Sequence, residues 1–280
     1  MDLTEKEIKH HSSSSIPVEI EPSEEYKLKR QQLLNTFIAK NVGRGIWNMF
    51  MTLVFALRYN IPEKYTTYQC ISLINYNFMR YCKEIYCLVC RNHAARYISN
   101  NKIVQRLRDI QNLEDEDKDN KLIFEYFNWL YNFRNSANSY ANKAHPEFED
   151  VLRFFNGEES GISHEDFCYA KIKDGIWHCI FLLATKSSQT DEIKATYFLI
   201  VNYFKYLPLK QKQIFDEAKL KYNFMQVLED DNSDEANCIY FFDWIYIMYR
   251  LLNEEYEIYE KELLQDVYYN MTFCSTSCGH

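Results

Sequence analysis

Two aromatic motifs occur twice in this chain, and this repetition constrains its fold more than any other feature. The segment Arg44–Phe50 (RGIWNMF) in the first half corresponds to Asp174–Ile180 (DGIWHCI) in the second. The segment Tyr126–Tyr131 (YFNWLY) likewise corresponds to Phe241–Tyr246 (FFDWIY). Internal repeats of this kind indicate a duplicated structural unit. The alternative is that two aromatic helical segments resemble each other by chance.

The apolar residues follow the period of an α-helix. They occur at positions i, i+3, i+4, i+7 and i+8 from residue 47 to residue 55, which places them on one helix face. The chain has only 6 Gly and 5 Pro, too few for the many tight turns of a strand-rich fold. We therefore expect an all-α fold with a four-helix bundle in the first half. The residues on this face are Trp47, Phe50, Met51, Val54 and Phe55.

Further helices are expected over about 65–86, from near Cys87, and over about 122–141, with a charged loop at 114–120. The residues that should face inward are Ile71, Ile74, Phe78 and Cys82 on the first, Cys90, Ala94 and Tyr97 on the second, and Phe124, Phe127, Leu130 and Tyr131 on the third.

The chain has 9 cysteines, among which Cys87/Cys90 and Cys274/Cys278 are closely spaced pairs. We expect the other five to behave as small buried apolar side chains. A dithiol exchanges with a disulfide through its thiolate, which the start of a helix stabilises. The CxxC motif followed by His93 therefore predicts either a redox dithiol or a zinc site. The zinc ligands would be Cys87, Cys90 and His93, with His145 or Cys82.

Three blocks of sequence stand in a fixed order: Gly43–Trp47 (GRGIW), Cys87–His93 (CLVCRNH) and Trp129–Asn138 (WLYNFRNSAN). Together they resemble the FAD-linked sulfhydryl oxidases of the Erv/ALR family, over roughly Gly43 to Lys143. The resemblance implies a four-helix bundle that holds FAD beside the second cysteine of the CxxC pair. It favours the redox interpretation of the dithiol.

The resemblance also implies roles for single residues. Cys90 would be the sulfur next to the flavin, and Cys87 would exchange with substrate. The remaining cofactor-binding residues would be Arg44, Trp47, His93, Asn135, Asn138 and Lys143. Met51 and Arg134 stand where the family commonly has histidines, and an arginine can bind a diphosphate through two hydrogen bonds.

We expect four parts in the chain: a mobile N-terminal tail over 1–35, an Erv-like domain over 36–150, a degenerate Erv-like helical domain over 151–270 and a cysteine-containing tail over 271–280. The second copy reads Leu207-Pro208-Leu209-Lys210 where its dithiol would fall, so it should lack catalysis. Cys274 and Cys278 could relay electrons from substrate to Cys87.

The function expected from the resemblance is oxidation of protein dithiols to disulfides, with electrons passing through the CxxC pair and FAD to O2 and yielding H2O2. An alternative is a non-catalytic interaction or scaffold protein with a degenerate oxidase fold. A duplicated bundle without a thioredoxin-like domain resembles viral sulfhydryl oxidases, and a homodimer is expected.

The net charge of −8 argues against nucleic acid as a main partner. No stretch of about 18 apolar residues is present, so we expect no membrane span. The N-terminus has no apolar signal segment. We therefore expect a location in the cytoplasm or nucleus of a host cell, or association with virions.

Overall fold

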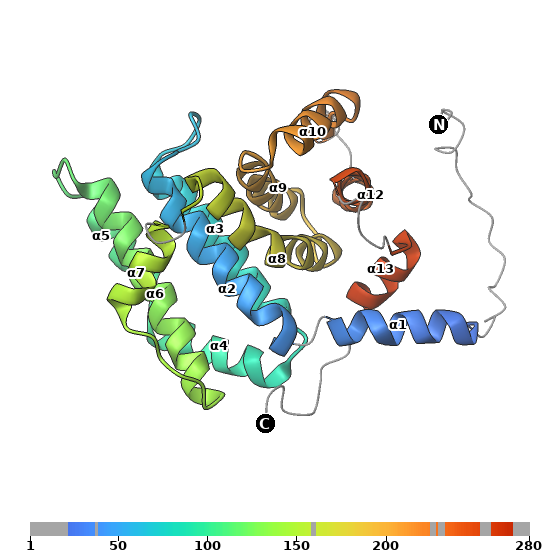
Figure 1. The fold of residues 1–280 in the computed structure, drawn as a ribbon, viewed down its shortest axis with the longest axis horizontal. Coiled ribbons are helices and arrows are strands. Elements are labelled where there is room, and N and C mark those ends of the chain that lie inside the picture. Colours follow the sequence, from blue (N-terminus) through green and yellow to red (C-terminus); the bar gives the residue numbers. More distant parts are fainter. Residues whose placement is uncertain are drawn as a thin grey trace.

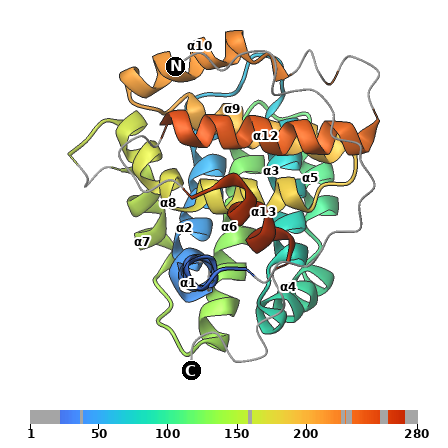
Figure 2. The same cartoon turned by 90° about the vertical axis from the view of Figure 1, so that its right-hand side faces the viewer.

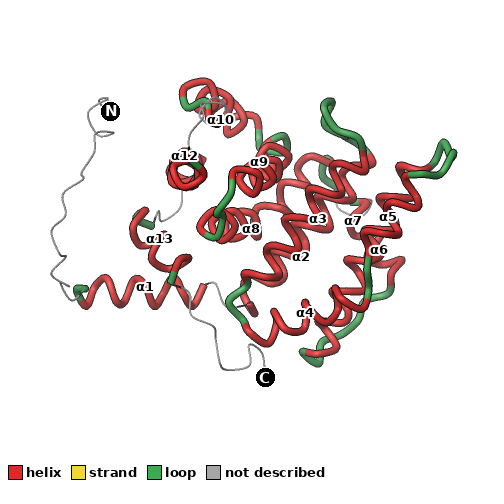
Figure 3. Tube along the Cα trace, turned by 180° about the vertical axis from the view of Figure 1, so that it is seen from behind, coloured by secondary structure: helices red, strands yellow, loops and turns green. Residues whose placement is uncertain are grey.

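The computed structural model describes residues 22–36, 39–157, 161–224, 228, 233–252 and 259–270. Every regular element within these residues is helical and none is a strand (Figure 3), which confirms the all-α prediction. The first half contains α1 (Glu24–Thr36), α2 (Ala39–Phe55), the short 3-10 helix η2 (Ala56–Arg58), α3 (Thr67–Glu84), α4 (Leu88–Asn100), α5 (Ile103–Gln111), α6 (Lys118–Tyr140) and α7 (Phe148–Asn156). The second half contains α8 (His164–Thr185), α9 (Thr190–Phe204), α10 (Leu209–Lys221), α12 (Asp234–Leu252) and α13 (Lys261–Tyr269). Within the described ranges, no helix has both the length and the apolar character needed to cross a bilayer.

Side-chain caps fix where several helices begin. The Thr66 hydroxyl accepts from the Gln69 N–H at the start of α3, and the Gln69 side chain accepts from the Thr66 N–H at 2.8 Å. The Ser163 hydroxyl accepts from the Asp166 N–H at 3.1 Å at the start of α8. These caps satisfy backbone donors that a helix leaves unpaired. The helix predicted over 65–86 is present, and Thr66 sets its first residue.

The N-terminal segment was predicted to be a tail to residue 35, and this was wrong for residues 24–35. Helix α1 forms there, with Leu33 fully buried. Arg30 of α1 pairs with Asp266 of α13 at 2.7 Å, and the Tyr26 hydroxyl donates to the same carboxylate. These contacts hold the first described helix against the last one (Figure 2).

The segment between Cys87 and the charged loop contains two helices where one was predicted. Asn101 ends α4, and its side-chain amide donates to the Tyr97 carbonyl at 3.0 Å. Helix α5 follows and buries Ile103 and Leu107, which are one turn apart. Helix α6 then begins at residue 118, earlier than predicted, with an acidic residue in its first turn that interacts favourably with the helix dipole.

The inward face predicted for α6 is correct in part. Phe127 and Leu130 are fully buried and Tyr131 is half-buried. Phe124 is instead 36% exposed, and the Arg58 guanidinium lies over its ring at 5.3 Å. Phe124 lies on the edge of the apolar face, where a cation covers it in place of the core.

The two halves meet where α2 crosses α8. These two helices pack against each other more extensively than any other pair in the described part of the chain (Figure 1). A Cβ atom added to Gly45 would lie 2.7 Å from the Asp174 carbonyl oxygen, and one added to Gly175 would lie 2.6 Å from the Gly45 carbonyl carbon. Glycine is therefore required at both positions, since any side chain would force the helices apart. Gly45 and Gly175 are equivalent residues of the repeated motif.

The repeated tryptophans make the same hydrogen bond in each half. Trp129 of α6 donates its indole N–H to the carbonyl of Asn101, the residue that ends α4, at 2.7 Å. Trp244 of α12 donates to the carbonyl of Tyr222, the residue that ends α10, at 3.0 Å. Each tryptophan thus ties the last long helix of its half to the end of the helix that starts at the dithiol or its counterpart.

The repeated tyrosines also have matching partners. The Tyr131 hydroxyl donates to the Pro146 carbonyl at 2.8 Å, two residues before α7 begins. The Tyr246 hydroxyl donates to the Tyr259 carbonyl at 3.2 Å, two residues before α13 begins. The sequence repeat is therefore accompanied by matching contacts in the two halves.

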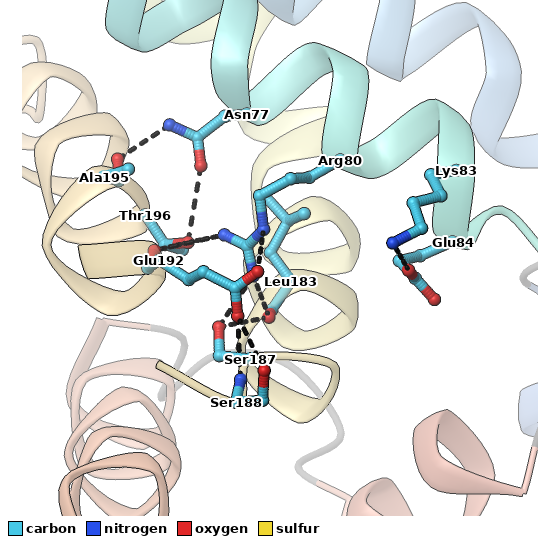
Figure 4. Close-up of polar contacts among 10 residues, drawn as sticks. All are labelled: Asn77, Arg80, Lys83, Glu84, Leu183, Ser187, Ser188, Glu192, Ala195 and Thr196. Carbon is cyan, nitrogen blue, oxygen red and sulfur yellow. Dashed lines mark hydrogen bonds and ion pairs between the residues drawn. The ribbon is translucent and has the colours of Figure 1, made fainter. Parts of the chain in front are cut away.

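Arg80 of α3 joins the halves through a second set of contacts (Figure 4). Its guanidinium is nearly buried and donates to the carbonyls of Leu183 and Glu192 and to the hydroxyls of Ser187 and Thr196, at 2.8 to 3.2 Å. One continuous hydrophobic core contains residues of both halves. The boundary expected near residue 150 stays a prediction.

Candidate dithiol site

The dithiol lies at the start of α4. Cys87 is the N-cap residue, and its sulfur accepts a hydrogen bond from the Cys90 N–H at 3.3 Å. A backbone donor and the positive end of the helix dipole both stabilise a thiolate at this position. Cys87 is fully buried and Cys90 is partly exposed. These exposures are the reverse of what the resemblance implies, because the exchanging sulfur should be the accessible one.

Aromatic rings from four helices pack together, and one of these helices is α4, which begins at the dithiol. Trp47 of α2 lies 5.6 Å from Phe78 of α3 and 5.3 Å from Phe133 of α6, measured between ring centroids. Phe133 also stacks on Tyr97 of α4, with centroids 4.3 Å apart. Trp47 is only half-buried. The site therefore has an apolar wall with aromatic faces, one of which is partly open to solvent.

His93 lies one turn after Cys90 on α4 and faces α6. Its Nε2 is 3.2 Å from the Ser136 hydroxyl, and its ring is 5.4 Å from that of Tyr140. Burial lowers the pKa of His93, and the charge of Arg96 lowers it further. The structure therefore favours a neutral imidazole beside the dithiol.

Two arginines interact at the outer edge of this wall. Burial lowers the pKa of Arg134 on α6, and the like charge of Arg44 on α2 lowers it further. Within the described residues, neither arginine forms an ion pair. The side-chain oxygen of the adjacent Asn135 is buried without a hydrogen-bond partner. Two like charges and an unsatisfied buried polar atom are costly unless a ligand compensates them. These residues fit an anionic group with hydrogen-bond donors, such as the diphosphate and sugar portion of FAD.

Asn138 and Lys143 shape the turn that follows α6. The Asn138 carbonyl accepts from the Lys143 N–H at 2.8 Å, and its side-chain amide donates to the Ala144 carbonyl at 3.3 Å. The Lys143 side chain is exposed. In this structure Asn138 orders the turn, and Lys143 remains available to a ligand from solvent.

Met51 is fully buried in the hydrophobic core. Among the residues that the structure describes, no three His, Cys, Asp or Glu side chains are placed to hold a metal ion, so the zinc ligand set is not assembled there. Cys274 and Cys278 lie outside the described residues.

The other five cysteines are mostly buried, as predicted. Cys70, Cys82, Cys168 and Cys179 are buried, whereas Cys238 is partly exposed. Burial raises the pKa of Cys70 to about 11 and that of Cys168 to about 12. Thiols with such pKa values are poor nucleophiles at neutral pH.

Two surface hollows lie away from the dithiol. One, of about 500 Å³, lies between α7 and α8 and is lined by residues such as Phe154, Phe167 and Lys171. The other, of about 440 Å³, is lined by Cys238, Phe242 and other residues. Neither contains a residue of the candidate site.

Three residues of the site were not predicted from the sequence as part of it: Phe133, Ser136 and Tyr140. Phe133 follows Leu130 at helical spacing, so the apolar period of α6 could have indicated it. No sequence signal indicates Ser136 or Tyr140, because their positions depend on how α4 packs against α6.

A scan against models of known protein families found no match for this chain, and searches of curated proteins and of solved structures also found none.

Proposed function

We propose that this chain is an FAD-linked sulfhydryl oxidase built from a duplicated helical bundle, with the dithiol in the first copy. Support comes from contacts between segments that are far apart in sequence: His93, one turn after Cys90, lies against Ser136 of α6, and Trp47 of α2 packs on Phe133 of α6. Cys87 and Cys90 on α4, Trp47 and Arg44 on α2, and Arg134 on α6 belong to helices that pack around one apolar wall. The three sequence blocks that carry the family resemblance therefore meet in space, and this observation carries the proposal.

The chemistry at the cysteines is thiol–disulfide exchange. With Cys87 and Cys90 joined as a disulfide, a substrate thiolate attacks the Cys87 sulfur and displaces Cys90 as a thiolate. A second substrate thiolate attacks the mixed disulfide, which releases the substrate disulfide and leaves Cys87 as a thiolate. The Cys90 N–H, which donates to the Cys87 sulfur, stabilises charge on this leaving group. Neutral His93 can accept the proton that a thiol releases when it becomes the attacking thiolate.

Arg44, Arg134 and Asn135 would hold the diphosphate and sugar portion of FAD, and Trp47 would pack on its rings. FAD bound there would supply a two-electron acceptor, so that two thiols and O2 yield one disulfide and H2O2. The neutral state of His93 keeps a positive charge away from the aromatic wall. Homodimer formation, protein dithiol substrates and a location in a host cell are further parts of the proposal.

The second copy would serve as a packing partner. Pro208 is the N-cap residue of α10, the place that Cys87 occupies in α4. A proline has no thiol, and α8 buries the face of α2 that carries Gly45. The second half therefore completes the core of the catalytic half.

The test combines a visible absorption spectrum with O2 consumption on dithiothreitol. We expect flavin bands in the purified protein, oxidation by the wild type, and a loss of at least about 100-fold in Cys87→Ser and Cys90→Ser. Cys238→Ser is the matched control, because Cys238 is partly exposed but lies in the second half, and it should keep wild-type activity.

The roles of the two sulfurs are separated by trapping. If Cys87 exchanges with substrate, Cys90→Ser should accumulate a mixed disulfide on Cys87, detected by mass spectrometry. Accumulation on Cys90 in Cys87→Ser would reverse the assignment, as the exposures of the two sulfurs favour. Wild-type O2 consumption in both variants would refute the oxidase proposal.

The second candidate function is a non-catalytic interaction protein. The observation that favours it is the dense packing around Phe133, whose ring already contacts those of Trp47, Tyr97 and Trp129. A colourless protein that folds and binds no added FAD would favour this alternative.

A further inference from the structure

Charge is distributed unevenly along the chain. Residues 26–146, which contain α2 to α6, hold 18 Lys and Arg against 9 Asp and Glu. Residues 147–280 hold 12 Lys and Arg against 24 Asp and Glu. Five of the nine acidic residues in the first range lie between 114 and 119, before or at the start of α6. The rest of the first half is therefore basic within an acidic protein.

Helix α4, which begins at the dithiol, and the helices α2 and α6 beside it have few acidic residues. Helices α2 and α4 contain no Asp or Glu, and α6 contains none after Glu125. The acid-free parts of these helices meet, because Trp47 of α2 packs on Phe133 of α6 and His93 of α4 lies 3.2 Å from the Ser136 hydroxyl. Helix α4, which begins at the dithiol, and the parts of α2 and α6 that pack with it therefore carry only neutral and basic side chains.

Basic side chains on these segments are exposed. Arg44 on α2, Arg96 on α4 and Lys143 just after α6 are all exposed. None of the three forms an ion pair with the described residues. Glu84, at the end of α3, lies 4.0 Å from Lys83, which partly offsets its charge. Helix α4 and the parts of α2 and α6 that pack with it therefore have uncompensated positive charge on their surface.

Two apolar side chains are exposed on the parts of these helices that lack acidic residues. Leu88, inside the CxxC motif, is 38% exposed, and Tyr140, whose ring contacts His93, is 55% exposed. Exposed tyrosine and arginine side chains together are typical of protein-binding surfaces.

We propose that this surface binds an acidic segment of the substrate protein, in which the reactive cysteines are flanked by Asp or Glu and by an apolar residue. The inference rests on the proposed oxidase function and assigns the substrate class of the same site. Disulfide exchange requires a substrate sulfur within bonding distance of the dithiol. The residues beside that sulfur must then lie over α4 and the adjoining ends of α2 and α6.

Arg96 is the best residue to test. Arg44 and Arg134 belong to the proposed cofactor site, and FAD would neutralise them in part. Arg96 lies two turns along α4 from Leu88, is exposed and contacts neither the dithiol nor the proposed cofactor. Its charge also lowers the pKa of His93, but burial is the larger cause, so His93 should stay neutral in Arg96→Gln. FAD would therefore leave the charge of Arg96 free to attract the substrate. A positive charge at this position raises the association rate of an acidic partner.

The experiment compares two reduced dithiol peptides of equal length and cysteine spacing. One has glutamates around its cysteines and the other has glutamines. We expect the full-length protein to oxidise the acidic peptide with a kcat/KM about 10-fold higher, and to lose this preference when salt is raised from about 0.02 to about 0.5 M. Arg96→Gln should lower kcat/KM for the acidic peptide about 3- to 10-fold and leave dithiothreitol oxidation unchanged. Arg108→Gln, the same change at an exposed position on α5, is the control and should behave as wild type.

A binding measurement separates this inference from the oxidase proposal. A fluorescent acidic peptide with serines in place of its cysteines should bind the wild type and bind Arg96→Gln more weakly, measured by anisotropy. If it does so while dithiothreitol is not oxidised, the acidic-segment site stands and the oxidase proposal fails. If dithiothreitol is oxidised but the two peptides react and bind equally, the inference is wrong. Displacement of the peptide by a short oligonucleotide at equal concentration would also overturn it, because the surface would then bind polyanions in general.

Discussion

At the scale of single residues, a buried histidine contributes to how this fold responds to acid. His178 of α8 is 5% exposed, and its Nδ1 lies 3.1 Å from the Tyr268 hydroxyl of α13. Burial lowers the pKa of His178 from 6.5 to about 3. The folded protein therefore keeps this imidazole neutral over a pH range in which the unfolded chain protonates it.

We expect the free energy of unfolding to fall as the pH falls from about 6.5 towards about 3, because the unfolded chain then binds a proton that the folded state excludes. His178 alone should lower it by about 2 kcal/mol at about pH 5. His178→Gln should remove this contribution, whereas His145→Gln, at an exposed position, should not. Urea denaturation at about pH 5 and about pH 7.5 measures the difference. Equal pH dependence in the wild type and in His178→Gln would contradict the argument.

Single residues were predictable from the sequence where the helical period decides their environment. The buried stripe of α3, which includes Ile74 and Phe78, was predicted correctly for this reason. Phe124 was not, because a period identifies a helix face but not how far the core extends along it. The approach of Arg44 to Arg134 depends on how α2 packs against α6, and no spacing within one helix encodes that distance.

At the scale of elements, the close crossing of α2 and α8 is the contact on which the arrangement of the halves depends. The sequence repeat identified Gly45 and Gly175 as equivalent positions, but it gave no indication that they touch each other. Close helix crossings need small residues because the backbones approach within van der Waals distance. Gly43 lies two residues before Gly45 on α2, and a Cβ atom added to it would have no other atom within 4 Å. The two glycines of the GRGIW segment therefore have different roles.

Gly45→Ala should destabilise the protein by about 2 kcal/mol or more, because the added methyl group meets the backbone of Asp174, which cannot rotate away. Gly43→Ala is the matched control and should stabilise it by about 0.5–1 kcal/mol, because alanine is the better helix former and nothing obstructs it. Thermal unfolding followed by circular dichroism at 222 nm measures both changes. Similar shifts in the two variants would show that the α2–α8 crossing is less close than described.

Element boundaries were predicted best where a cap or a strong apolar period marks them, as at Thr66 and Cys87. Helix α5 was missed because it is short and follows α4 after a break at Asn101. Helix α1 was missed because its sequence is polar and has almost no apolar face. Its position depends on Leu33 and on the ion pair with Asp266, which is a contact with the other end of the chain.

At the scale of the whole molecule, the two halves depend on each other for burial. The hydrophobic core is continuous between them. Arg80 of α3 donates hydrogen bonds to backbone and side-chain groups of α8 and α9 and the residues between them. Helix α1 also packs against α13. Separation would expose the crossing face of α2 and leave the guanidinium of Arg80 without these partners. The repeated motifs predicted two copies but could not show this dependence, because that prediction rests on similarity of sequence and not on contacts.

We therefore expect the full chain to unfold in a single cooperative transition, and residues 22–157 and 161–270 expressed separately to show helical structure without one. Each fragment would expose the apolar surface that α2 and α8 bury in each other, which favours aggregation or a loosely packed state over a rigid fold. Co-expression should restore a soluble complex with a cooperative transition, since the halves meet through a complementary surface and no chemical step is needed to join them. Calorimetry of the full chain and near-ultraviolet circular dichroism of the fragments make the comparison. If residues 22–157 alone unfold cooperatively at the temperature of the full chain, then the first half is an independent domain, and the second half contributes little to its stability.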